Sequence, residues 1–415
     1  MHKVQAAAEL HIRKTPADPA ARGYRAEDLD TPAIVLDLDI LENNIRRYAE
    51  AARQSGKQLW PMVKTHKSLE IARLQAEAGC TGFLCGTLDE AEALAEAGYR
   101  HLMYAYPPAG RASVNRVIRL ARKTEELILR LDSLEAAAAL EEAARESEAR
   151  KAEALVSGAS GQPAGTLILD YTVILDCGLH RFGLSPERIA DFVLEMQRFP
   201  HLRFRGISTH PGQVYGAAGP AEIPEYCRQE TEAIRRAVEK LADAGIRPEI
   251  VSSGSTPTFA GTVGAPLITH YHPGNYVFND AIQLSNGTAE EGDCALRIAA
   301  AVISHPSEGH FVVDAGAKCL GLDQGAHGNS SVRGHGRILG HPELTVSHLS
   351  EEVGQVEAEG ETSLRIGDRV TIIPNHSCSS ANLTDWYLGV RNGVLEQLIP
   401  VDMRGNRTTK QRGAE

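Results

Sequence analysis

Short apolar runs alternate with longer helix-like segments along the first two thirds of the chain. The apolar runs are typical of β-strands, whereas the segments between them are rich in Ala, Leu, Glu and Arg, which lose little rotamer freedom in a helix. After an initial strand at 33–39 and a helix at 40–54, the pattern predicts further strands at 59–64, 82–87, 101–106, 127–132, 172–177, 204–209, 249–253 and 268–277. It predicts helices between these strands at 67–78, 88–97, 111–122, 133–151, 186–198 and 225–244.

This succession of strand and helix units predicts an α/β fold, a parallel (β/α)8 barrel of the TIM type. The closed sheet of such a barrel leaves no strand edge exposed. A doubly wound open sheet is the structural alternative. That fold would favour a glycine-rich GxGxxG turn after its first strand, and this chain has KTHKSL at that point. The pattern therefore favours the barrel.

The pattern changes after residue 280, where Gly, Thr, Ser and Val dominate and short alternating runs such as RIAAAVIS and DRVTIIP appear without a convincing amphipathic helix. We therefore expect a barrel domain at 29–280 and a β-rich domain at 281–402. The strand at 33–39 precedes the barrel series, so it is a candidate for pairing with the β domain instead. Loosely held segments are expected at 1–28 (an N-terminal extension), 152–165 (an insertion) and 403–415 (a tail).

The composition is that of a globular protein that acts on small molecules. Of the 415 residues, 42% are hydrophobic and 23% are charged, which excludes disorder as the main state. The formal net charge of −11 offers no basic field for nucleic acid or for an acidic membrane surface, so we expect neither as a partner. No apolar run approaches the roughly 20 residues that span a bilayer, and the N-terminus lacks the apolar core of a signal peptide, so we expect a cytoplasmic protein.

Lys64 is the first candidate for chemistry, because active sites of such barrels lie at the C-terminal ends of the strands. It ends the apolar run LWPMV, and the two-residue alternation of a strand places it inside the barrel together with Met62. Desolvation of an amine there would lower its pKa and make it a nucleophile for an aldehyde. A solvent-facing lysine at a strand end is the alternative.

Two further groups of strand-end residues suit an anionic ligand. The run SSGSTPT at 252–258 follows the seventh strand, where barrels commonly hold a phosphate, although it could also be an ordinary Ser/Gly turn. It contains Ser253, Gly254, Ser255 and Thr256. Arg181 lies in DCGLHRFGL, where its guanidinium could reach a phenolate or a carboxylate, or else form a surface salt bridge.

His376 and Cys378 form a candidate metal site in the β domain. They stand at i and i+2, so on a strand both side chains would point to the same face. Zinc accepts such an N/S pair, and because no second cluster of this kind is evident, the pair favours an open site with water or substrate in the remaining positions. A core cysteine beside a satisfied histidine is the alternative.

With these residues located, the chain resembles the D-serine dehydratase and D-threonine aldolase family, pyridoxal-phosphate enzymes with an alanine racemase-like fold. The resemblance covers about 29–402. It is carried in order by LDTPAIVLDLDILENNI, VKTHKS, DCGLHRFG, THPGQVYG, VSSGSTPT, HPGNYVFND, VVDAGAKCLGLD and PNHSC. It implies a barrel that holds the cofactor, a β domain that supplies metal ligands, and a homodimer.

The resemblance also implies roles for particular residues, matched motif by motif. Lys64 would bind the cofactor aldehyde covalently. Ser253, Gly254, Ser255 and Tyr276, together with Thr256 of the same run, would hold the phosphate. Arg181, Gln213 and Tyr215 would orient the cofactor ring, and His376 with Cys378 would bind the divalent metal. The positions at which this sequence matches the family's motifs in this way are Lys64, Arg181, Gln213, Tyr215, Ser253, Gly254, Ser255, Thr256, Tyr276, His376 and Cys378.

The metal pair distinguishes two reactions within the family. Its dehydratases resemble this sequence in using His-x-Cys with zinc, whereas its aldolases tend to have His-x-Asp with manganese or another hard ion. Cys378 therefore favours a zinc-assisted elimination that converts a D-β-hydroxy-amino acid to a 2-oxo acid and ammonia. Aldol cleavage is the alternative, with His66 or His210 as the base. An amino-acid racemase and a non-catalytic carrier of pyridoxal phosphate are the remaining alternatives.

Two positions depart from the family's pattern. The family often has His where Met62 stands, and it usually has a glycine pair where this chain has Ser253 and Gly254. The first change would remove a polar contact below the cofactor, and the second would reshape the phosphate site. Neither removes Lys64 or the metal pair.

Overall fold

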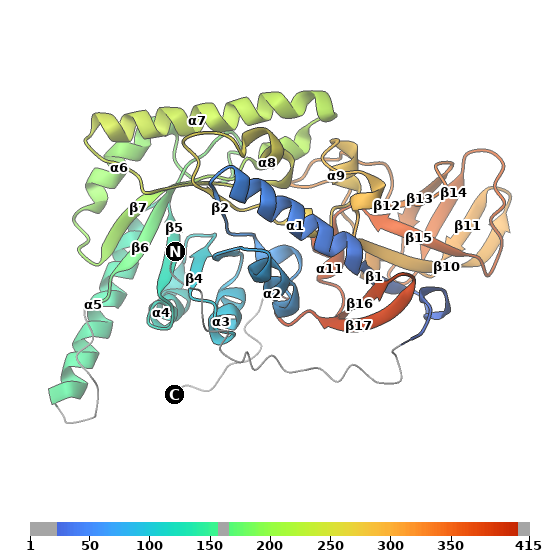
Figure 1. Ribbon diagram of the computed structural model, residues 1–415, viewed down its shortest axis with the longest axis horizontal. Coiled ribbons are helices and arrows are strands. Elements are labelled where there is room, and N and C mark those ends of the chain that lie inside the picture. Colours follow the sequence, from blue (N-terminus) through green and yellow to red (C-terminus); the bar gives the residue numbers. More distant parts are fainter. Residues whose placement is uncertain (1–22, 157–165, 406–415) are drawn as a thin grey trace.

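The computed structural model describes residues 23–156 and 166–405, which form a barrel and a separate β-sheet (Figure 1). The predicted loose segments 1–28, 152–165 and 403–415 fall largely or partly outside these residues. Within the described part of the chain, no helix is both long and apolar enough to cross a membrane.

The predicted (β/α)8 barrel is confirmed. Its eight parallel strands follow the order β2-β9-β8-β7-β6-β5-β4-β3. An isolated parallel bridge between Met62 and Leu84, with the Leu84 amide donating to the Pro61 carbonyl at 3.0 Å, joins the two ends of this order and closes the sheet. The strands are β2 (Gln58–Leu59), β3 (Phe83–Cys85), β4 (His101–Tyr104), β5 (Glu126–Leu131), β6 (Leu169–Ile174), β7 (Leu202–Ser208), β8 (Ile250–Ser253) and β9 (His270–Tyr271).

Several strand boundaries differ from the prediction. The predicted strand 59–64 is reduced to β2 and followed by the short 3-10 helix η2 (Val63–Thr65), and the predicted 268–277 is reduced to β9 and followed by η6 (Asn275–Val277). Backbone hydrogen bonds between the two segments continue as far as the Met62 N–H, which donates to the Pro273 carbonyl at 3.1 Å, and both segments then coil into their 3-10 helices. Lys64 consequently lies in a turn, not on a strand.

Helices cover the outside of the barrel close to the predicted positions. Asp37, Ser68 and Thr87 begin three of them by accepting hydrogen bonds from backbone N–H groups of the first turn. The helix α8 was not predicted, because its sequence STPTFAGT is typical of a turn. The helices are α1 (Leu38–Gln54), α2 (Leu69–Glu77), α3 (Leu88–Glu96), α4 (Gly110–Ala121), α5 (Leu134–Val156), α6 (Ile189–Met196), α7 (Ile223–Asp243) and α8 (Thr256–Thr262).

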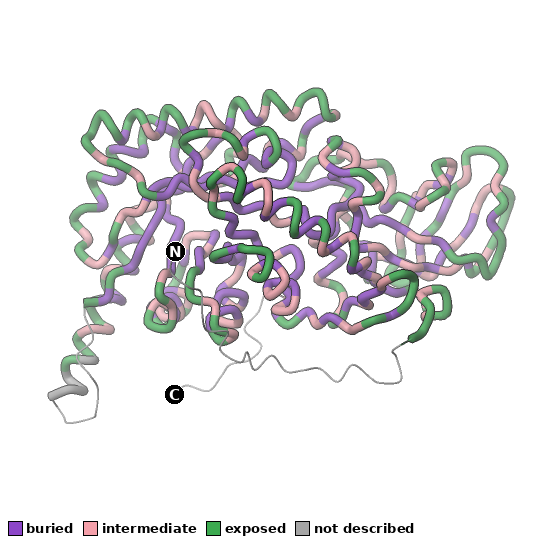
Figure 2. The backbone as a smooth tube through the Cα atoms, viewed as in Figure 1, coloured by how far each residue is buried: buried purple, intermediate pink, exposed green. Residues whose placement is uncertain are grey.

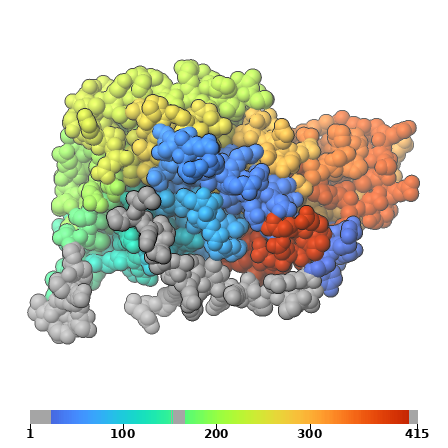
Figure 3. Space-filling model, in the orientation of Figure 1, coloured from blue at the N-terminus to red at the C-terminus, as the bar shows by residue number. Residues whose placement is uncertain are grey.

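The second sheet has nine strands, and the N-terminal strand β1 (Ala33–Asp37) lies in its middle. β1 pairs antiparallel with β10 and parallel with β16, which joins the N-terminal part of the described chain to its C-terminal part, and blue and red surfaces adjoin in Figure 3. The other strands are β10 (Leu296–Ser307), β11 (His310–Val313), β12 (Gly336–Ile338), β13 (Leu344–Leu349), β14 (Gly354–Ala358), β15 (Arg369–Pro374), β16 (Trp386–Arg391) and β17 (Val394–Pro400). Three short helices interrupt this region, contrary to the predicted all-strand texture: α9 (Ala281–Ser285), α10 (Ala317–Leu320) and α11 (Ser377–Ala381).

Apolar side chains fill both the barrel interior and the layer between strands and helices. The strands are accordingly mostly buried, whereas the helices alternate between buried and exposed positions (Figure 2). The interior group comprises Trp60, Met62, Leu84, Met103, Ala105, Ile128 and Ile250. This packing separates the two ends of the barrel.

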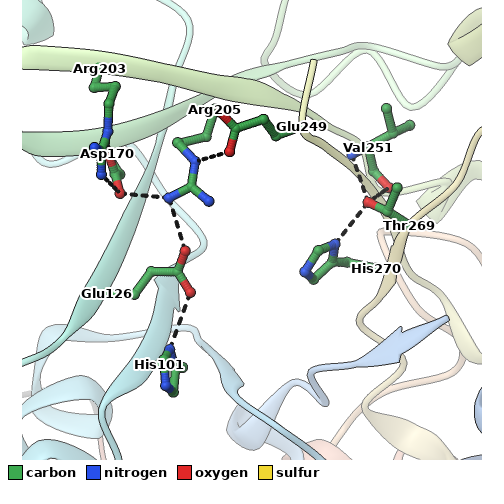
Figure 4. A network of polar contacts seen from close by, with 9 residues as sticks. All are labelled: His101, Glu126, Asp170, Arg203, Arg205, Glu249, Val251, Thr269 and His270. Carbon is green, nitrogen blue, oxygen red and sulfur yellow. Dashed lines mark hydrogen bonds and ion pairs between the residues drawn. The ribbon is translucent and has the colours of Figure 1, made fainter. Parts of the chain in front are cut away.

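The N-terminal end of the barrel carries a network of ion pairs (Figure 4). Arg205 on β7 contacts Asp170 at 2.8 Å, Glu126 at 3.0 Å and Glu249 at 2.9 Å. Arg203 forms a two-pronged contact with the same Asp170 carboxylate, at 2.6 and 2.8 Å. The charged groups at this end are paired with one another, whereas the active sites of such barrels lie at the opposite end, at the C-terminal ends of the strands.

Candidate active site

A cavity of about 90 Å³ lies where the C-terminal ends of the barrel strands meet loops of the β domain. The structure brings together there most of the residues that the sequence suggested, from both parts of the chain. The predicted residues that line the cavity are Lys64, Arg181, His210, Tyr215, Gly254, Ser255, Thr256, His376 and Cys378.

Lys64 reaches the cavity from the turn η2, next to the barrel interior. Its side chain is only half-buried, in contrast to the buried amine that the sequence predicted. Its Nζ lies 3.5 Å from the hydroxyl of Tyr106. Gly86 leaves room for it, since a Cβ at that position would lie 3.1 Å from the Lys64 Cβ.

The loop after β8 approaches the next strand too closely for any side chain at Gly254. A Cβ there would lie 2.6 Å from the backbone of His272. Ser255 caps α8 by accepting the Thr258 N–H, and Thr256 Oγ1 accepts the N–H of Tyr276 at 3.1 Å. The loop is therefore rigidly held at the cavity wall.

Arg181 lies at the cavity mouth, where its guanidinium is exposed. It stands over the ring of Phe182, 4.5 Å from the centroid, and 5.8 Å from the centroid of Tyr106. A cation held against aromatic rings at a cavity mouth is placed to meet an anionic ligand.

Four predicted residues do not line the cavity. His66 is fully buried behind η2, the turn that carries Lys64 and is called the lysine turn below. Its Nδ1 accepts the Ser68 N–H at 3.1 Å, and burial lowers its pKa to about 3. Gln213 donates from Nε2 to the Cys177 carbonyl at 2.8 Å. It therefore supports the loop that carries Arg181.

The other two, Ser253 and Tyr276, face away from the cavity. The Ser253 hydroxyl donates to the buried carboxyl of Glu230, whose pKa burial raises to about 7. The Tyr276 ring stacks on Tyr48 at 4.3 Å between centroids, and its hydroxyl accepts from Gln75 at 3.0 Å. Alternation along a strand could not predict these directions, because both residues lie at or beyond the point where a strand ends.

Arg130 and His272 line the cavity although the sequence analysis did not single them out. Arg130 is buried on β5, its Nε donates to Ser208 at 2.8 Å, and burial lowers its pKa to about 10. His272 Nδ1 lies 2.7 Å from the Trp60 carbonyl, and burial lowers its pKa to about 3. Arg130 Nη2 and His272 Nε2 have no hydrogen-bond partner among the described residues. The sequence feature that could have indicated Arg130 is its position inside the apolar run LILRLD.

His210 presents one defined ring nitrogen to the cavity. Its Nδ1 lies 2.5 Å from the carbonyl of Gly254, and because a carbonyl only accepts, Nδ1 carries the hydrogen. Burial, together with the positive charge of Lys64, holds the pKa of His210 well below its usual range, so the ring is neutral. Nε2 therefore offers a lone pair.

His376 and Cys378 meet as predicted, but not on a strand. His376 is the N-cap of α11 and Cys378 is the second residue of that helix, because the chain turns directly after Pro374. Cys378 Sγ lies 3.3 Å from Thr65 Oγ1, which places the pair beside the lysine turn. Asp323 Oδ1 lies 3.7 Å from His376 Nδ1.

The two side chains stabilise each other's charged forms. Burial alone would raise the pKa of the Cys378 thiol, but the His376 imidazolium and its hydrogen bond outweigh this effect and lower it. Burial would likewise lower the pKa of His376, yet the Cys378 thiolate and Asp323 hold it well above its usual range. By contrast, burial raises the pKa of Cys80 to about 12. Among the described residues, no group of three or more His, Cys, Asp and Glu side chains is arranged to hold a metal ion.

Two family models match the chain. The model described as alanine racemase, N-terminal domain, matches residues 36–281. The model described as putative serine dehydratase domain matches residues 295–390. The first covers the barrel and the second covers most of the β-rich part, including His376 and Cys378.

Characterised proteins of similar length support the same assignment. A 3-hydroxy-D-aspartate aldolase from Paracoccus denitrificans (strain Pd 1222) is 28% identical over 93% of this chain and 95% of its own length. A D-threo-3-hydroxyaspartate dehydratase from Delftia sp. (strain HT23) is 30% identical over 85% of this chain and 92% of its own.

Solved structures share the fold over nearly the whole chain. The D-threonine aldolase from Filomicrobium marinum superposes with a TM-score of 0.78 at 28% identity, covering 93% of this chain and 99% of that one. A metal-free cysteine-to-alanine mutant of D-threo-3-hydroxyaspartate dehydratase gives a TM-score of 0.77 at 27% identity, covering 92% of this chain and 100% of that one. The chain belongs to the D-serine dehydratase and D-threonine aldolase family, whose members have an alanine racemase-like fold.

Proposed function

We propose that the protein is a pyridoxal-phosphate- and zinc-dependent lyase that removes water from a D-β-hydroxy-amino acid. The products are a 2-oxo acid and ammonia. One observation carries this proposal: a single cavity brings the amine of Lys64 together with the His376 and Cys378 pair. The relatives catalyse elimination or aldol cleavage, both of which suit these groups.

The cavity suits an anionic cofactor such as pyridoxal phosphate. Lys64, Arg130 and Arg181 line it, whereas none of its lining residues within the described chain is Asp or Glu. The buried Arg130 Nη2 has an unused donor, and Gly254 and Gly274 clear space that side chains would fill, since a Cβ at Gly274 would lie 2.8 Å from Thr65 Oγ1. We assign the phosphate to the loop at 254–256 and the covalent bond to Lys64.

The donor set at His376 and Cys378 suits zinc. A thiolate with a lowered pKa and an imidazole are ligands that zinc prefers, whereas manganese favours carboxylates. Asp323 next to His376 would orient the imidazole. Two protein ligands leave positions for water or for the substrate. Manganese or another divalent ion remains the alternative occupant.

Side chains of the protein then have separate roles in the reaction. When bound, pyridoxal phosphate delocalises the electron pair left at Cα, and a divalent metal offsets the charge that develops on the departing oxygen. Lys64 Nζ takes the Cα proton, with the Tyr106 hydroxyl 3.5 Å away as its hydrogen-bond partner. Arg181 at the mouth binds an anionic group of the cofactor or substrate, and the apolar wall of Met62 and Leu84 excludes water.

Aldol cleavage is the second candidate, and His210 is the observation that favours it. Its Nε2 lone pair faces the cavity, where it could take a proton from the β-hydroxyl before the Cα–Cβ bond breaks. His66, the other predicted base, is enclosed and does not line the cavity. Racemisation would not need the metal pair, and neither would a carrier of pyridoxal phosphate.

Product analysis tests the proposal. The purified protein, loaded with pyridoxal phosphate and zinc, is incubated with D-serine, D-threonine and D-threo-3-hydroxyaspartate. Elimination yields ammonia with pyruvate, 2-oxobutanoate or oxaloacetate. Glycine with an aldehyde would establish the aldolase, and inversion at Cα without release of ammonia would establish a racemase. Unchanged elimination after complete metal removal would contradict the role of zinc.

The homodimer implied by the family resemblance is also our proposal. Sedimentation equilibrium of the loaded protein is expected to give twice the chain mass of 44.8 kDa. A single-chain mass at micromolar concentration would contradict it.

A further inference from the structure

The loop between α10 and β12 brings a second histidine to the cavity from the β domain. The loop closes on itself, because the Ser331 N–H donates to the Gln324 carbonyl at 2.9 Å and the Asn329 N–H donates to the Ala326 carbonyl at 3.1 Å. A Cβ at Gly325 would lie 1.8 Å from the Asn329 carbonyl oxygen, so only glycine fits this turn. His327 lies at the bend and lines the cavity.

The backbone of His327 adopts a conformation that few histidines adopt. Its φ is +55°, in the left-handed region, which costs free energy for a residue with a Cβ. Such a conformation persists where surrounding contacts determine it. Here the ring lies 5.4 Å from the His210 ring in an edge-on arrangement and 5.3 Å from the Tyr215 ring.

The two histidines face each other through their Nε2 atoms, which are 3.4 Å apart. Because His210 Nδ1 already donates to Gly254, the neutral His210 ring has only a lone pair at Nε2. A hydrogen bond between the two rings therefore requires that His327 Nε2 carry the hydrogen. The distance is long for an N–H donor, so this hydrogen bond is one that a better-placed donor can replace.

We propose that His327 is a positioning residue for His210. In the free enzyme its Nε2–H donates to the Nε2 lone pair of His210 and fixes that ring, and a hydroxyl of the bound substrate then replaces it as the donor. The inference deepens the proposed function and rests on it, since it concerns which group of the substrate His210 receives. It implies that substrates carry a hydroxyl where His327 Nε2–H stands. It also assigns a role to the β domain beyond metal binding.

Variants at position 327 separate the ring from the backbone. His327→Gly keeps the left-handed backbone and removes the donor, whereas His327→Asn tolerates that backbone and retains an N–H. His348→Asn is the matched control, because His348 is an exposed histidine of the same domain on β13 that does not line the cavity.

The first readout does not depend on lyase activity. In ¹⁵N-histidine-labelled protein loaded with pyridoxal phosphate and zinc, the His210 Nε2 resonance is expected to move downfield in His327→Gly, where the lone pair loses its donor. It should stay near the wild-type value in His327→Asn and in His348→Asn. An unchanged His210 resonance in His327→Gly would overturn the proposal, whatever reaction the enzyme catalyses.

Steady-state kinetics provide the second readout. Because the substrate hydroxyl replaces the His327 hydrogen bond on binding, the loss of that bond acts on the free enzyme. In His327→Gly the substrate itself must order the His210 ring, so KM for the best D-β-hydroxy-amino acid is expected to rise about fivefold, the worth of one hydrogen bond, while kcat stays within about twofold. His327→Asn should restore most of the wild-type KM. An unchanged KM in His327→Gly would overturn the positioning role. A moved resonance in a protein without lyase activity would refute the proposed function alone.

Discussion

The polar groups at the two ends of the barrel differ in whether they have partners. At the N-terminal end, Arg205 is surrounded by three carboxylates, and Asp170 is shared with Arg203 (Figure 4). At the C-terminal end, Arg130 Nη2 and His272 Nε2 lack partners among the described residues, although both side chains are buried. The same closed sheet therefore has one end whose charged groups are paired with one another and one end with buried polar atoms that await a ligand.

This difference indicates that the polar groups at one end stabilise the fold, whereas those at the other end serve to bind a ligand. A buried donor or acceptor without a partner costs about 1–3 kcal/mol, so the unsatisfied groups are not there to stabilise the fold. Groups of this kind cluster where a bound ligand completes them. The following predictions test that division.

The largest effect is expected for Lys64→Ala. Removal of the amine eliminates both the covalent attachment of the cofactor and the group assigned to the Cα proton, so we expect the rate of ammonia release to fall by at least about 10⁴-fold. The melting temperature should change by only a few degrees, since Lys64 is half-buried and forms no ion pair among the described residues. Ammonia release at the wild-type rate would contradict the assignment.

Cys378→Ala is expected to reduce the elimination rate by about 10³-fold, because the metal loses its thiolate ligand. The absorbance of bound pyridoxal phosphate should persist, since Lys64 is intact. Metal analysis by mass spectrometry should show less than stoichiometric zinc. The buried Cys80, whose raised pKa keeps it a thiol, provides the matched control Cys80→Ala. Full zinc content in Cys378→Ala would count against this site.

Arg130→Met and Arg205→Met place the two ends in direct comparison. Arg205→Met removes the central cation of the network, although Arg203 still pairs with Asp170, and is expected to lower the free energy of unfolding by about 1–2 kcal/mol, with kcat per folded molecule unchanged. Arg130→Met removes an incompletely paired buried charge, so the free energy of unfolding should change by less than about 1 kcal/mol while kcat/KM falls about 10²-fold. Urea titrations and initial rates measure both. The reverse pattern would refute the division between the ends.

Much of this arrangement follows from the sequence, and the exceptions have physical causes. The strand and helix alternation predicts the barrel, and polar residues at strand ends point to the cavity. The apolar pattern predicts a strand through Lys64, because the apolar residues continue to Val63 although the chain already coils into η2 there. His327 left no signal at all, since its loop has no periodicity and its partner lies 117 positions away.

The sequence pattern also does not predict in which direction side chains point at the ends of strands. Ser253 turns to Glu230 and Tyr276 turns to Gln75, although neighbours in the same motifs face the cavity. The direction of each side chain depends on which helix, distant in the sequence, supplies its hydrogen-bond partner. Arg130 was within reach of prediction, because an arginine inside an apolar strand needs an anionic partner or ligand.

The smallest effect concerns Glu230, the buried carboxyl beneath the cavity loop. Burial raises its pKa to about 7, above the unfolded value near 4.5, so the folded state holds the proton more tightly. The stabilisation is complete below pH 4.5 and is lost as the pH rises through 7. We expect the free energy of unfolding to fall by about 2 kcal/mol between pH 5 and pH 8. In Glu230→Gln this contribution should be absent, as denaturant titrations at several pH values will show.

The central claim is that Lys64 holds pyridoxal phosphate covalently at the unsatisfied end of the barrel. Borohydride reduction of the loaded protein, followed by proteolysis and mass spectrometry, tests it directly. We predict a pyridoxyl-phosphate mass on the peptide that contains Lys64 and on no other lysine. A label on a different lysine, or no label in a protein that retains activity, would contradict the account.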